Sequence, residues 1–179
     1  VMDKRNGIGR YTFANGAYYD GMRKNDVKNG HGRFVWKDGT AYVGDWNNNM
    51  KEGKGIYIYR GGEEYNGDWK NDLRNGKGVY KFSNGDVYEG DYLDDERTGQ
   101  GKLHYKNGEE YTGRFLKGAK SGLGTMIWKN GDVYVGNWEN GLQSGQGKLT
   151  KKNKDIIEGQ FRNGYMDGQI IIHYADGSK

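Results

Sequence analysis

One glycine returns every 23 residues along the whole chain, with no insertion or deletion between copies. It occupies Gly7, Gly30, Gly53, Gly76, Gly99, Gly122, Gly145 and Gly168. Two further glycine columns keep the same period, and an aromatic residue precedes one of them by two positions in most copies. A fixed period of this length is typical of repeat proteins, in which each unit packs mainly against its neighbours. The period therefore predicts a repetitive fold and argues against a single buried catalytic pocket.

Composition favours a folded chain with much aromatic surface. The 179 residues include 33 glycines, 15 tyrosines and five tryptophans, with no proline and no cysteine. Disordered chains are poor in aromatic residues, so the low hydrophobic content does not indicate disorder here. The absence of cysteine excludes disulfides and thiolate zinc sites. The net charge of +4 is spread evenly, so we expect no nucleic-acid partner.

Each repeat carries the pattern of a β-hairpin. An Asn-Gly or Asp-Gly pair recurs between aromatic and β-branched residues, as at Asn130-Gly131, which is a strong hairpin signal. A two-residue turn there would place Trp128 and Tyr134 on opposite faces of the sheet. A three-residue loop closed by a left-handed glycine instead pairs Met126 with Tyr134 and brings every aromatic column to one face. We therefore predict the three-residue loop.

This register also gives the glycines a role. Gly124 and Gly136 would face each other and leave bare backbone, across which a large ring from the same or the next repeat could lie. A phosphate cradle is the alternative for G-x-G, but no helix follows to supply a dipole. The other face pairs opposite charges, as in Lys54 with Asp68. The polar segment between hairpins, such as residues 47–52, is predicted to be a loop.

Hairpins in series predict an all-β fold, an elongated single-layer antiparallel meander of tandem hairpins. No segment has helical periodicity, so we expect no second layer over the aromatic face and rings that remain partly open. Residues 1–179 would form a single array, with units that start near residues 19, 42, 65, 88, 111, 134 and 157 and a partial repeat at 1–18. The chain begins at Val1 within a repeat, so we expect it to be a piece of a longer protein.

The repeat pattern decays toward the C-terminus. Ile157 replaces the aromatic residue, Ile170 replaces a glycine, and Ile156, Ile171 and Ile172 complete an aliphatic cluster. This cluster is predicted to be an end cap, as repeat arrays require. The alternative is an edge for self-association or for a partner, because an unpaired apolar strand favours pairing.

The order Y-x-G-x-W, six residues, G-x-G and an Asn-Gly or Asp-Gly turn resembles the MORN repeat (membrane occupation and recognition nexus). The best copies are Y-V-G-D-W-N-N-N-M-K-E-G-K-G from Tyr42 and Y-N-G-D-W-K-N-D-L-R-N-G-K-G from Tyr65. The resemblance covers the whole chain in seven to eight copies, although Arg23 stands where the motif has Trp and Ile157 where it has Tyr. It implies an elongated single-layer antiparallel sheet.

The same resemblance suggests several functions. MORN-repeat proteins include membrane-junction proteins, cytoskeletal scaffolds of protozoan parasites and ciliary radial-spoke proteins. The repeats also occur as accessory regions of phosphoinositide kinases and of a lysine methyltransferase. The family was named for membrane association, but many members bind proteins. The resemblance implies an intracellular, cytoplasmic protein that is associated with cytoskeleton, cilium or membrane. The chain has no long apolar run, so neither a transmembrane helix nor a signal peptide is predicted, which agrees with this location.

The residues offer no catalytic constellation. His31 is predicted to face Asp45 and His104 to face Glu110, as exposed cross-strand ion pairs. The acidic run 94–96 is predicted to lie in a solvated loop, with a weak cation site as the alternative. No serine sits in a nucleophile elbow. We therefore expect no enzyme, no cofactor and no metal site.

We expect a non-enzymatic scaffold that binds a protein partner, as a peptide or a helix, or a second copy of itself as a homodimer. Aromatic residues are favoured anchors at interfaces, so the aromatic-lined face is the predicted surface. The alternative for each residue is that the ring only holds its own hairpin. The candidate residues are Phe34, Trp36, Tyr42, Trp46, Tyr57, Tyr59, Tyr65, Trp69, Tyr80, Phe82, Tyr88, Tyr92, Tyr105 and Trp128.

Two other ligands remain open at the level of sequence. Lys148, Lys151, Lys152 and Lys154 form a small basic cluster that could bind anionic phospholipid, such as a phosphoinositide headgroup, because each basic residue near an anionic surface contributes about 1 kcal/mol. Aromatic cages that hold small cations also occur in repeats rich in Gly, Trp and Tyr. The regular motif of this chain fits such cages poorly.

Overall fold

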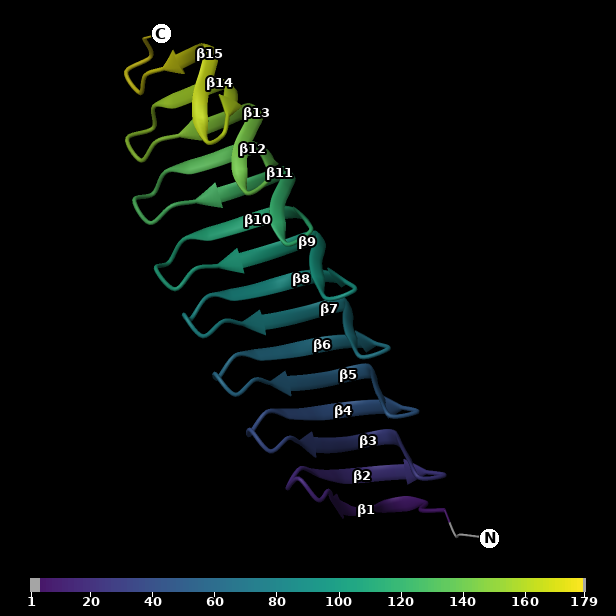
Figure 1. The fold of residues 1–179 in the computed structure, drawn as a ribbon. Helices are drawn as coiled ribbons and strands as arrows, with labels where there is room; N and C mark the ends of the chain where they lie inside the picture. Colours follow the sequence, from purple (N-terminus) through teal and green to yellow (C-terminus); the bar gives the residue numbers. More distant parts are fainter. Residues whose placement is uncertain (1–3, 179) are drawn as a thin grey trace. The chain divides into compact units, whose positions relative to one another are not determined.

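The fold is a sheet without helices. The computed structural model describes residues 4–178, and these contain fifteen β-strands and no helix. No described segment is therefore a helix with the length and hydropathy needed to cross a bilayer. The strands form one antiparallel sheet and follow one another in the order of the chain (Figure 1). This confirms the predicted all-β, single-layer meander.

Short and long strands alternate after the first strand, β1 (Gly7–Thr12). The seven-residue strands are β2 (Tyr18–Lys24), β4 (Ala41–Asn47), β6 (Glu64–Lys70), β8 (Val87–Leu93), β10 (Glu110–Leu116), β12 (Val133–Glu139) and β14 (Ile156–Arg162). The nine-residue strands are β3 (Val27–Val35), β5 (Met50–Ile58), β7 (Leu73–Lys81), β9 (Glu96–His104), β11 (Ala119–Ile127), β13 (Leu142–Thr150) and β15 (Tyr165–His173).

The chain divides into two compact units. The first comprises the described residues 4–84 together with 92–95, and the second comprises 85–91 together with 96–178. Strands β1 to β7 belong to the first unit, and strands β9 to β15 belong to the second. Both units repeat the same alternation of a short and a long strand.

Hairpins at the Asn-Gly and Asp-Gly pairs have the predicted three-residue loop, as the hydrogen bonds at Gly16, Gly39, Gly108, Gly131 and Gly177 show. Gly131 donates its N–H to the carbonyl oxygen of Trp128 at 2.9 Å, and Trp128 donates to that of Asp132 at 2.9 Å. Gly131 adopts φ +89°, the left-handed conformation that closes such a loop. Met126 pairs with Tyr134, and equivalent hairpins keep this register. The predicted register is confirmed.

The polar segment between hairpins is not a loop, so that prediction was wrong. β4 ends at Asn47 and β5 begins at Met50, which leaves only Asn48 and Asn49 in the turn, with φ of 47° and 71°. Two successive left-handed residues form a type I′ turn, whose twist matches that of the flanking strands. Asn and Asp tolerate this conformation, so the polar residues build a second, tighter hairpin.

Each long strand bends at the glycine of the 23-residue period. Gly30 adopts φ +88°, which only glycine reaches without strain. Next to Gly30, the pairing of β2 with β3 contains a bulge. Gly21 pairs with Gly32 and Arg23 pairs with Lys28, so residues 29–31 of β3 lie opposite the single residue Met22 of β2. Such a bulge bends the strand. Figure 1 shows the result as the curled start of long strands such as β13.

The core of six consecutive repeats is a tyrosine that lies across two facing glycines. Tyr42 extends from β4 over Gly44 and Gly55, and its hydroxyl donates to the carbonyl oxygen of Asp45 at 3.0 Å. A Cβ on Gly44 would lie 2.6 Å from that hydroxyl, so no side chain fits. The sequence expectation of a ring across paired glycines is confirmed. The fully buried tyrosines of this kind, here called the clamp tyrosines, are Tyr19, Tyr42, Tyr65, Tyr88, Tyr111 and Tyr134.

Candidate functional site

Most of the aromatic residues predicted to bind a partner are buried inside the repeats. Eight of them expose 9% or less of their surface, because the bent starts of the long strands fold over the aromatic face. The expectation of an uncovered aromatic face was therefore wrong for these rings. Trp46 illustrates their role, since its indole N–H donates to the carbonyl oxygen of Gly32 at 3.1 Å. The eight are Phe34, Tyr42, Trp46, Tyr65, Trp69, Tyr80, Tyr88 and Tyr92.

Basic side chains from the bent strands lie against these buried rings. The ammonium nitrogen of Lys28 lies 3.7 Å from the centroid of the Trp46 ring and 4.6 Å from that of Phe34. Burial lowers the pKa of Lys28 to about 8. The same position carries a basic residue in five consecutive repeats: Lys28, Lys51, Arg74, Arg97 and Lys120. The sequence analysis missed this column, although its 23-residue period could have revealed it.

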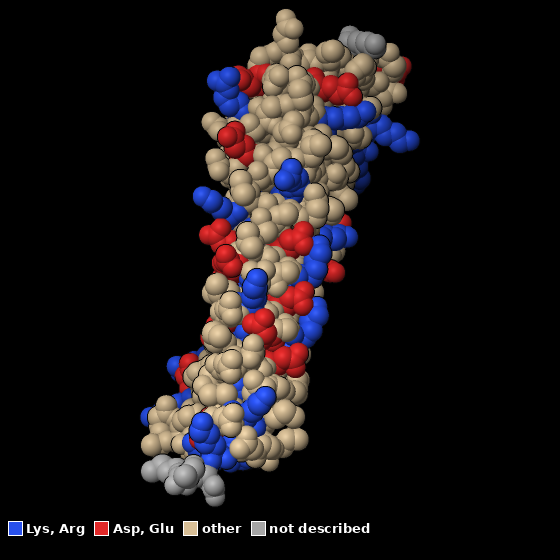
Figure 2. Space-filling model, turned by 90° about the vertical axis from the view of Figure 1, so that its right-hand side faces the viewer, with Lys and Arg blue, Asp and Glu red and all other residues tan. Residues whose placement is uncertain are grey.

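The two-residue turns hold several of these cations. The Arg74 Nε lies 2.9 Å from the Asp95 Oδ1, and the Lys51 Nζ lies 3.1 Å from the Asp72 Oδ1. Asp95 forms a two-residue turn with Asp94 and Glu96 begins β9, so the acidic run is not a loop as predicted, although Asp94 and Glu96 are exposed to solvent. Viewed from the side of these turns, acidic and basic residues are interspersed (Figure 2). This side therefore presents no large patch of one charge.

A second set of rings keeps part of its surface in solvent. Of the predicted residues, Trp36, Tyr57, Tyr59, Phe82, Tyr105 and Trp128 are half-buried. All except Tyr57 stand directly before a three-residue loop. Phe13 has the same position and exposure, but the sequence analysis missed it although it lies one period before Trp36. We call these residues the turn-side rings: Phe13, Trp36, Tyr59, Phe82, Tyr105 and Trp128.

In the first unit the turn-side rings alternate with rings that lie deeper. The ring of Tyr57 has its centroid 5.5 Å from that of Trp36 and 4.6 Å from that of Tyr59. Tyr80 lies 5.9 Å from Tyr59 and 4.6 Å from Phe82 in the same way. Phe34 also contacts the turn-side rings on both sides of it. These contacts make one continuous aromatic strip, here called the first-unit strip: Phe13, Phe34, Trp36, Tyr57, Tyr59, Tyr80 and Phe82.

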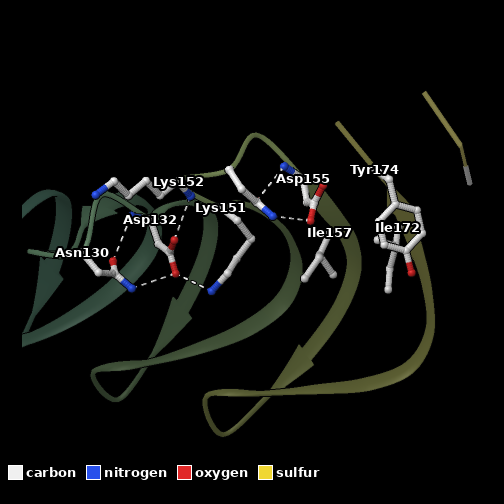
Figure 3. A pocket seen from close by; sticks show the side chains of 9 residues that line it. Asn130, Asp132, Lys151, Lys152, Asp155, Ile157, Ile172 and Tyr174 are labelled. Carbon is white, nitrogen blue, oxygen red and sulfur yellow. Dashed lines mark hydrogen bonds and ion pairs between the residues drawn. The ribbon is translucent and has the colours of Figure 1, made fainter. Parts of the chain in front are cut away.

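The second unit lacks such a strip. Leu103, Met126 and Leu149 occupy the positions of the deeper rings, and Lys151 stands one period after Trp128 in place of a turn-side ring. Beside Lys151 lies a hollow of about 500 Å³. Ile157, Ile172 and Tyr174 line its apolar side, and Asn130, Asp132, Lys152, Asn153 and Asp155 line it with Lys151 on the polar side (Figure 3).

The lysine cluster proposed for phospholipid is partly neutralised. Lys151 forms an ion pair with Asp132, whose carboxylate also accepts the Lys152 backbone N–H (Figure 3). The Lys151 ammonium is the main cause of the lowered pKa of Asp132. Lys148 lies 3.2 Å from a carboxylate oxygen of Glu158. Lys154 occupies the left-handed loop position with φ 75° and stays exposed, so the four lysines do not converge on one anion site.

The histidines form the predicted cross-strand pairs. His31 Nδ1 lies 3.1 Å from the Asp45 Oδ1, and His104 Nδ1 lies 3.0 Å from the Glu110 Oε2. Both histidines are exposed. Within residues 4–178, no three His, Asp or Glu side chains gather closely enough to share a metal ion.

The sequence matches the family model described as MORN repeat along its whole length. The matched segments are residues 1–18, 19–41, 42–64, 65–87, 88–110, 111–133, 134–156 and 158–179. No protein of curated function matches the chain.

Solved structures with a similar fold include domains of SAS-4 and CPAP. The SAS-4 (dCPAP) TCP domain of Drosophila melanogaster, in complex with a proline-rich motif of Ana2, is 15% identical over 96% of this chain and 86% of its own, with a TM-score of 0.53. The TCP10 domain of Danio rerio CPAP, in complex with a STIL peptide, is 11% identical over 94% and 70%, with a TM-score of 0.54. The CPAP G-box domain is 15% identical over 96% of both chains, with a TM-score of 0.53. At such low identity these likenesses concern the fold alone.

Proposed function

Because the chain belongs to the MORN-repeat family, we propose that it is a non-enzymatic scaffold that binds a peptide segment of a partner protein along the first-unit strip. The observation that carries this proposal is the selective exposure of one aromatic column. The clamp tyrosines are fully buried, whereas Trp36, Tyr59 and Phe82, one period apart, are half-buried and keep part of their surface in solvent. Single exposed apolar residues are normal on a protein surface, but a contiguous apolar strip usually marks an interaction site.

Large aromatic side chains directly before a three-residue loop are better placed to bind a partner than to stabilise their own hairpin. Trp36 contacts the rings of Phe34 and Tyr57, and part of its own ring stays in solvent. Tryptophan and tyrosine are the residues most enriched among binding hot spots. Two fold neighbours, SAS-4 and CPAP, are complexes with peptides of Ana2 and STIL, which supports a peptide as the partner. A cytoskeletal or ciliary location inside the cell is part of the same proposal.

The test is selection from a phage-displayed library of random peptides on the immobilised chain. We expect peptides that bind the wild type and bind at least about tenfold more weakly to the Trp36→Ala/Tyr59→Ala variant, because truncation of hot-spot aromatic residues typically removes 2 kcal/mol or more. Circular dichroism should show an unchanged fold, since neither ring is buried.

Trp128→Ala is the matched control, because Trp128 has the same loop position but belongs to the second unit, where the deeper residues are aliphatic. Its peptide binding should equal that of the wild type. If no peptide is enriched, or if the enriched peptides bind the double variant as well as they bind the wild type, the proposal is wrong.

Phospholipid has less support as the ligand. Two of the four candidate lysines are paired with carboxylates, and Asp132 and Asp155 line the hollow beside them. An anionic headgroup at this place would meet negative charge as well as positive charge. We therefore keep a peptide as the proposed ligand.

A further inference from the structure

The column of turn-side rings is interrupted once in the second unit. An aromatic residue stands directly before the three-residue loops with a period of 23 residues, but Lys151 stands before the loop of residues 152–154. One period later the column is aromatic again, at Tyr174. The hollow of about 500 Å³ lies at this interruption, and both Lys151 and Tyr174 line it.

The hollow lies where the missing ring would lie. In the first unit, a turn-side ring packs against the deeper ring 21 residues further along the chain, as Trp36 does against Tyr57 with 5.5 Å between the centroids. Two other pairs of rings repeat this contact. The residue 21 positions after Lys151 is Ile172, and Ile172 lines the hollow. The hollow is therefore the vacant place of a turn-side ring.

The side chains at the interruption leave this place open. The Lys151 ammonium group forms an ion pair with Asp132. Ile157, Ile172 and Tyr174 lie on the other side of the hollow (Figure 3). Ile157 is also smaller than the clamp tyrosine that six other repeats have at its position. Both isoleucines are only half-buried, so apolar surface remains beside the vacant place.

The polar side of the hollow is already satisfied by bonds within the chain. Asp132 is only 7% exposed, and its carboxylate accepts hydrogen bonds from the Asn130 side chain at 3.0 Å and from the Lys152 backbone N–H at 2.9 Å. The Asp155 carboxylate accepts a hydrogen bond from the Asn153 side chain at 2.7 Å. Sites for free small molecules use converging polar groups to fix the orientation of the ligand. A ring that is tethered to another polypeptide does not need such groups.

We propose that the hollow binds a tryptophan or tyrosine side chain of a partner protein, which takes the place of the ring that Lys151 lacks. Such side chains are the usual anchors of protein interfaces. The occupant is neutral, because the two lysines and two aspartates of the lining have no net charge. The volume lies within the range of about 300–1000 Å³ that is common for ligand pockets. This site belongs to the second unit and does not depend on peptide binding by the first-unit strip.

The probe is N-acetyl-L-tryptophanamide, a neutral molecule with the indole ring of a tryptophan side chain. Binding is followed by NMR titration of the protein with ¹³C-labelled isoleucine methyl groups, since Ile157 and Ile172 line the hollow. We expect the signals of both residues to shift with a dissociation constant on the order of 1 mM. N-acetyl-L-leucinamide is apolar but has no ring, and it should bind at least about threefold more weakly. Free L-tryptophan adds two charges to the indole, and it should bind no better than the amide.

Three variants locate the site. Lys151→Trp supplies the missing ring from within the chain, so it should weaken probe binding at least about tenfold and show nuclear Overhauser contacts between the new ring and the Ile172 methyl groups. Lys151→Gln removes the same charge without adding a ring, and it should bind the probe as the wild type does. Lys106→Trp adds the same ring at an exposed loop residue that does not line the hollow, and it should also leave binding unchanged. Circular dichroism checks that each variant keeps the fold.

Several outcomes would overturn the proposal. Unchanged Ile157 and Ile172 signals at probe concentrations well above the expected dissociation constant would reject the site. Equal binding of N-acetyl-L-leucinamide would mean that any apolar group is accepted. Undiminished binding by Lys151→Trp, or an equal loss in Lys151→Gln, would show that the hollow is not the place of a missing ring.

Two further results would identify a different occupant. Tighter binding of free L-tryptophan than of the amide would make the hollow a site for a small molecule. A dimer of the wild type in sedimentation velocity that Lys151→Trp abolishes would make the occupant a ring of a second copy. The first-unit strip is tested separately by Trp36→Ala/Tyr59→Ala, so failure at the hollow leaves the proposed function standing.

Discussion

At the scale of single residues, each glycine column answers a different physical demand. Gly53 is needed for its backbone, which adopts φ +66° at the bend of β5. Gly44 is needed for its missing side chain, because the Tyr42 ring occupies that space. The C-terminal repeat shows that a glycine is needed only where a clamp tyrosine covers it. Where Ile157 replaces the clamp tyrosine, no ring occupies the space, and Ile170 stands at the glycine position opposite Gly159.

Gly44→Ala should therefore destabilise the fold strongly. The new Cβ would lie 2.5 Å from the Cα of Gly55 and from the carbonyl oxygen of Lys54, which are backbone atoms that cannot turn away. Overpacking of this kind lowers the free energy of unfolding by about 1–3 kcal/mol, and more when backbone must move. Urea denaturation followed by circular dichroism measures the change.

Gly9→Ala is the matched control. Gly9 and Gly32 both pair with Gly21, one from each neighbouring strand. A Cβ added to Gly9 would, however, have no atom within 4 Å. We expect its free energy of unfolding to stay within about 0.5 kcal/mol of the wild type. A loss in Gly9→Ala as large as that in Gly44→Ala would show that a ring across the glycines is not the reason for the column.

At the scale of elements, the three-residue loops and the two-residue turns have different roles in the sheet. The three-residue loops fix which face the aromatic residues occupy, because a shift by one residue would turn every side chain to the other face. The two-residue turns connect one repeat to the next and demand two left-handed residues in succession. Asn140-Gly141 meets this demand well, whereas Lys117-Gly118 places a lysine at φ 49°.

Lys117→Asn should stabilise the protein. A residue with a long side chain is strained by about 1 kcal/mol in the left-handed conformation, whereas asparagine adopts it readily. We expect a gain of about 0.5–1 kcal/mol in the free energy of unfolding, measured by urea denaturation. The reciprocal substitution Asn140→Lys, in the equivalent turn, should lose a similar amount. A gain in both variants would rule out backbone strain as the cause.

At the scale of the whole molecule, repetition multiplies small ionisation effects. Burial raises the pKa of Tyr111 and of Tyr134 to about 12, and it also raises the pKa of Tyr42 and Tyr65. Each of these hydroxyls donates a hydrogen bond to a backbone carbonyl three residues further along the chain. These four clamp tyrosines therefore resist ionisation together, and their effects on stability have the same sign.

Stability should consequently fall in alkali. An unfolded tyrosine ionises near pH 10, so between pH 10 and about 12 the folded state binds more protons than the unfolded state, and the free energy of unfolding decreases as pH rises. Lys28 acts in the opposite direction, since its lowered pKa adds stability between pH 8 and about 10.5. Burial also lowers the pKa of Lys120, and these two half-buried lysines are outweighed by several buried tyrosines above pH 10.

Absorbance at 295 nm and circular dichroism, recorded on the same samples, test this expectation. We expect the clamp tyrosines to ionise only as the β-sheet signal disappears. Ionisation of all 15 tyrosines near pH 10 with an unchanged sheet signal would contradict it.

The sequence by itself determined the all-β class, the 23-residue unit, the register of the hairpins and the placement of a ring across paired glycines. These features are local, since turn residues and alternation within about 15 residues decide them. Polar pairs such as Asn48-Asn49 were ambiguous, because the same residues suit a solvated loop and a type I′ turn.

Only the tertiary structure decided which aromatic residues remain accessible. The sequence predicts that Trp46 and Trp36 share one face of the sheet and that Trp36, close to the turn, has less to cover it. It does not reveal that Lys28 and the bend at Gly30 bury Trp46, while Trp36 is only half-buried. That difference arises when a strand folds back over its neighbours, and it depends on contacts between repeats that no pattern within one repeat contains. The proposed partner surface is therefore a property of stacked repeats, whereas the hairpin is a property of one.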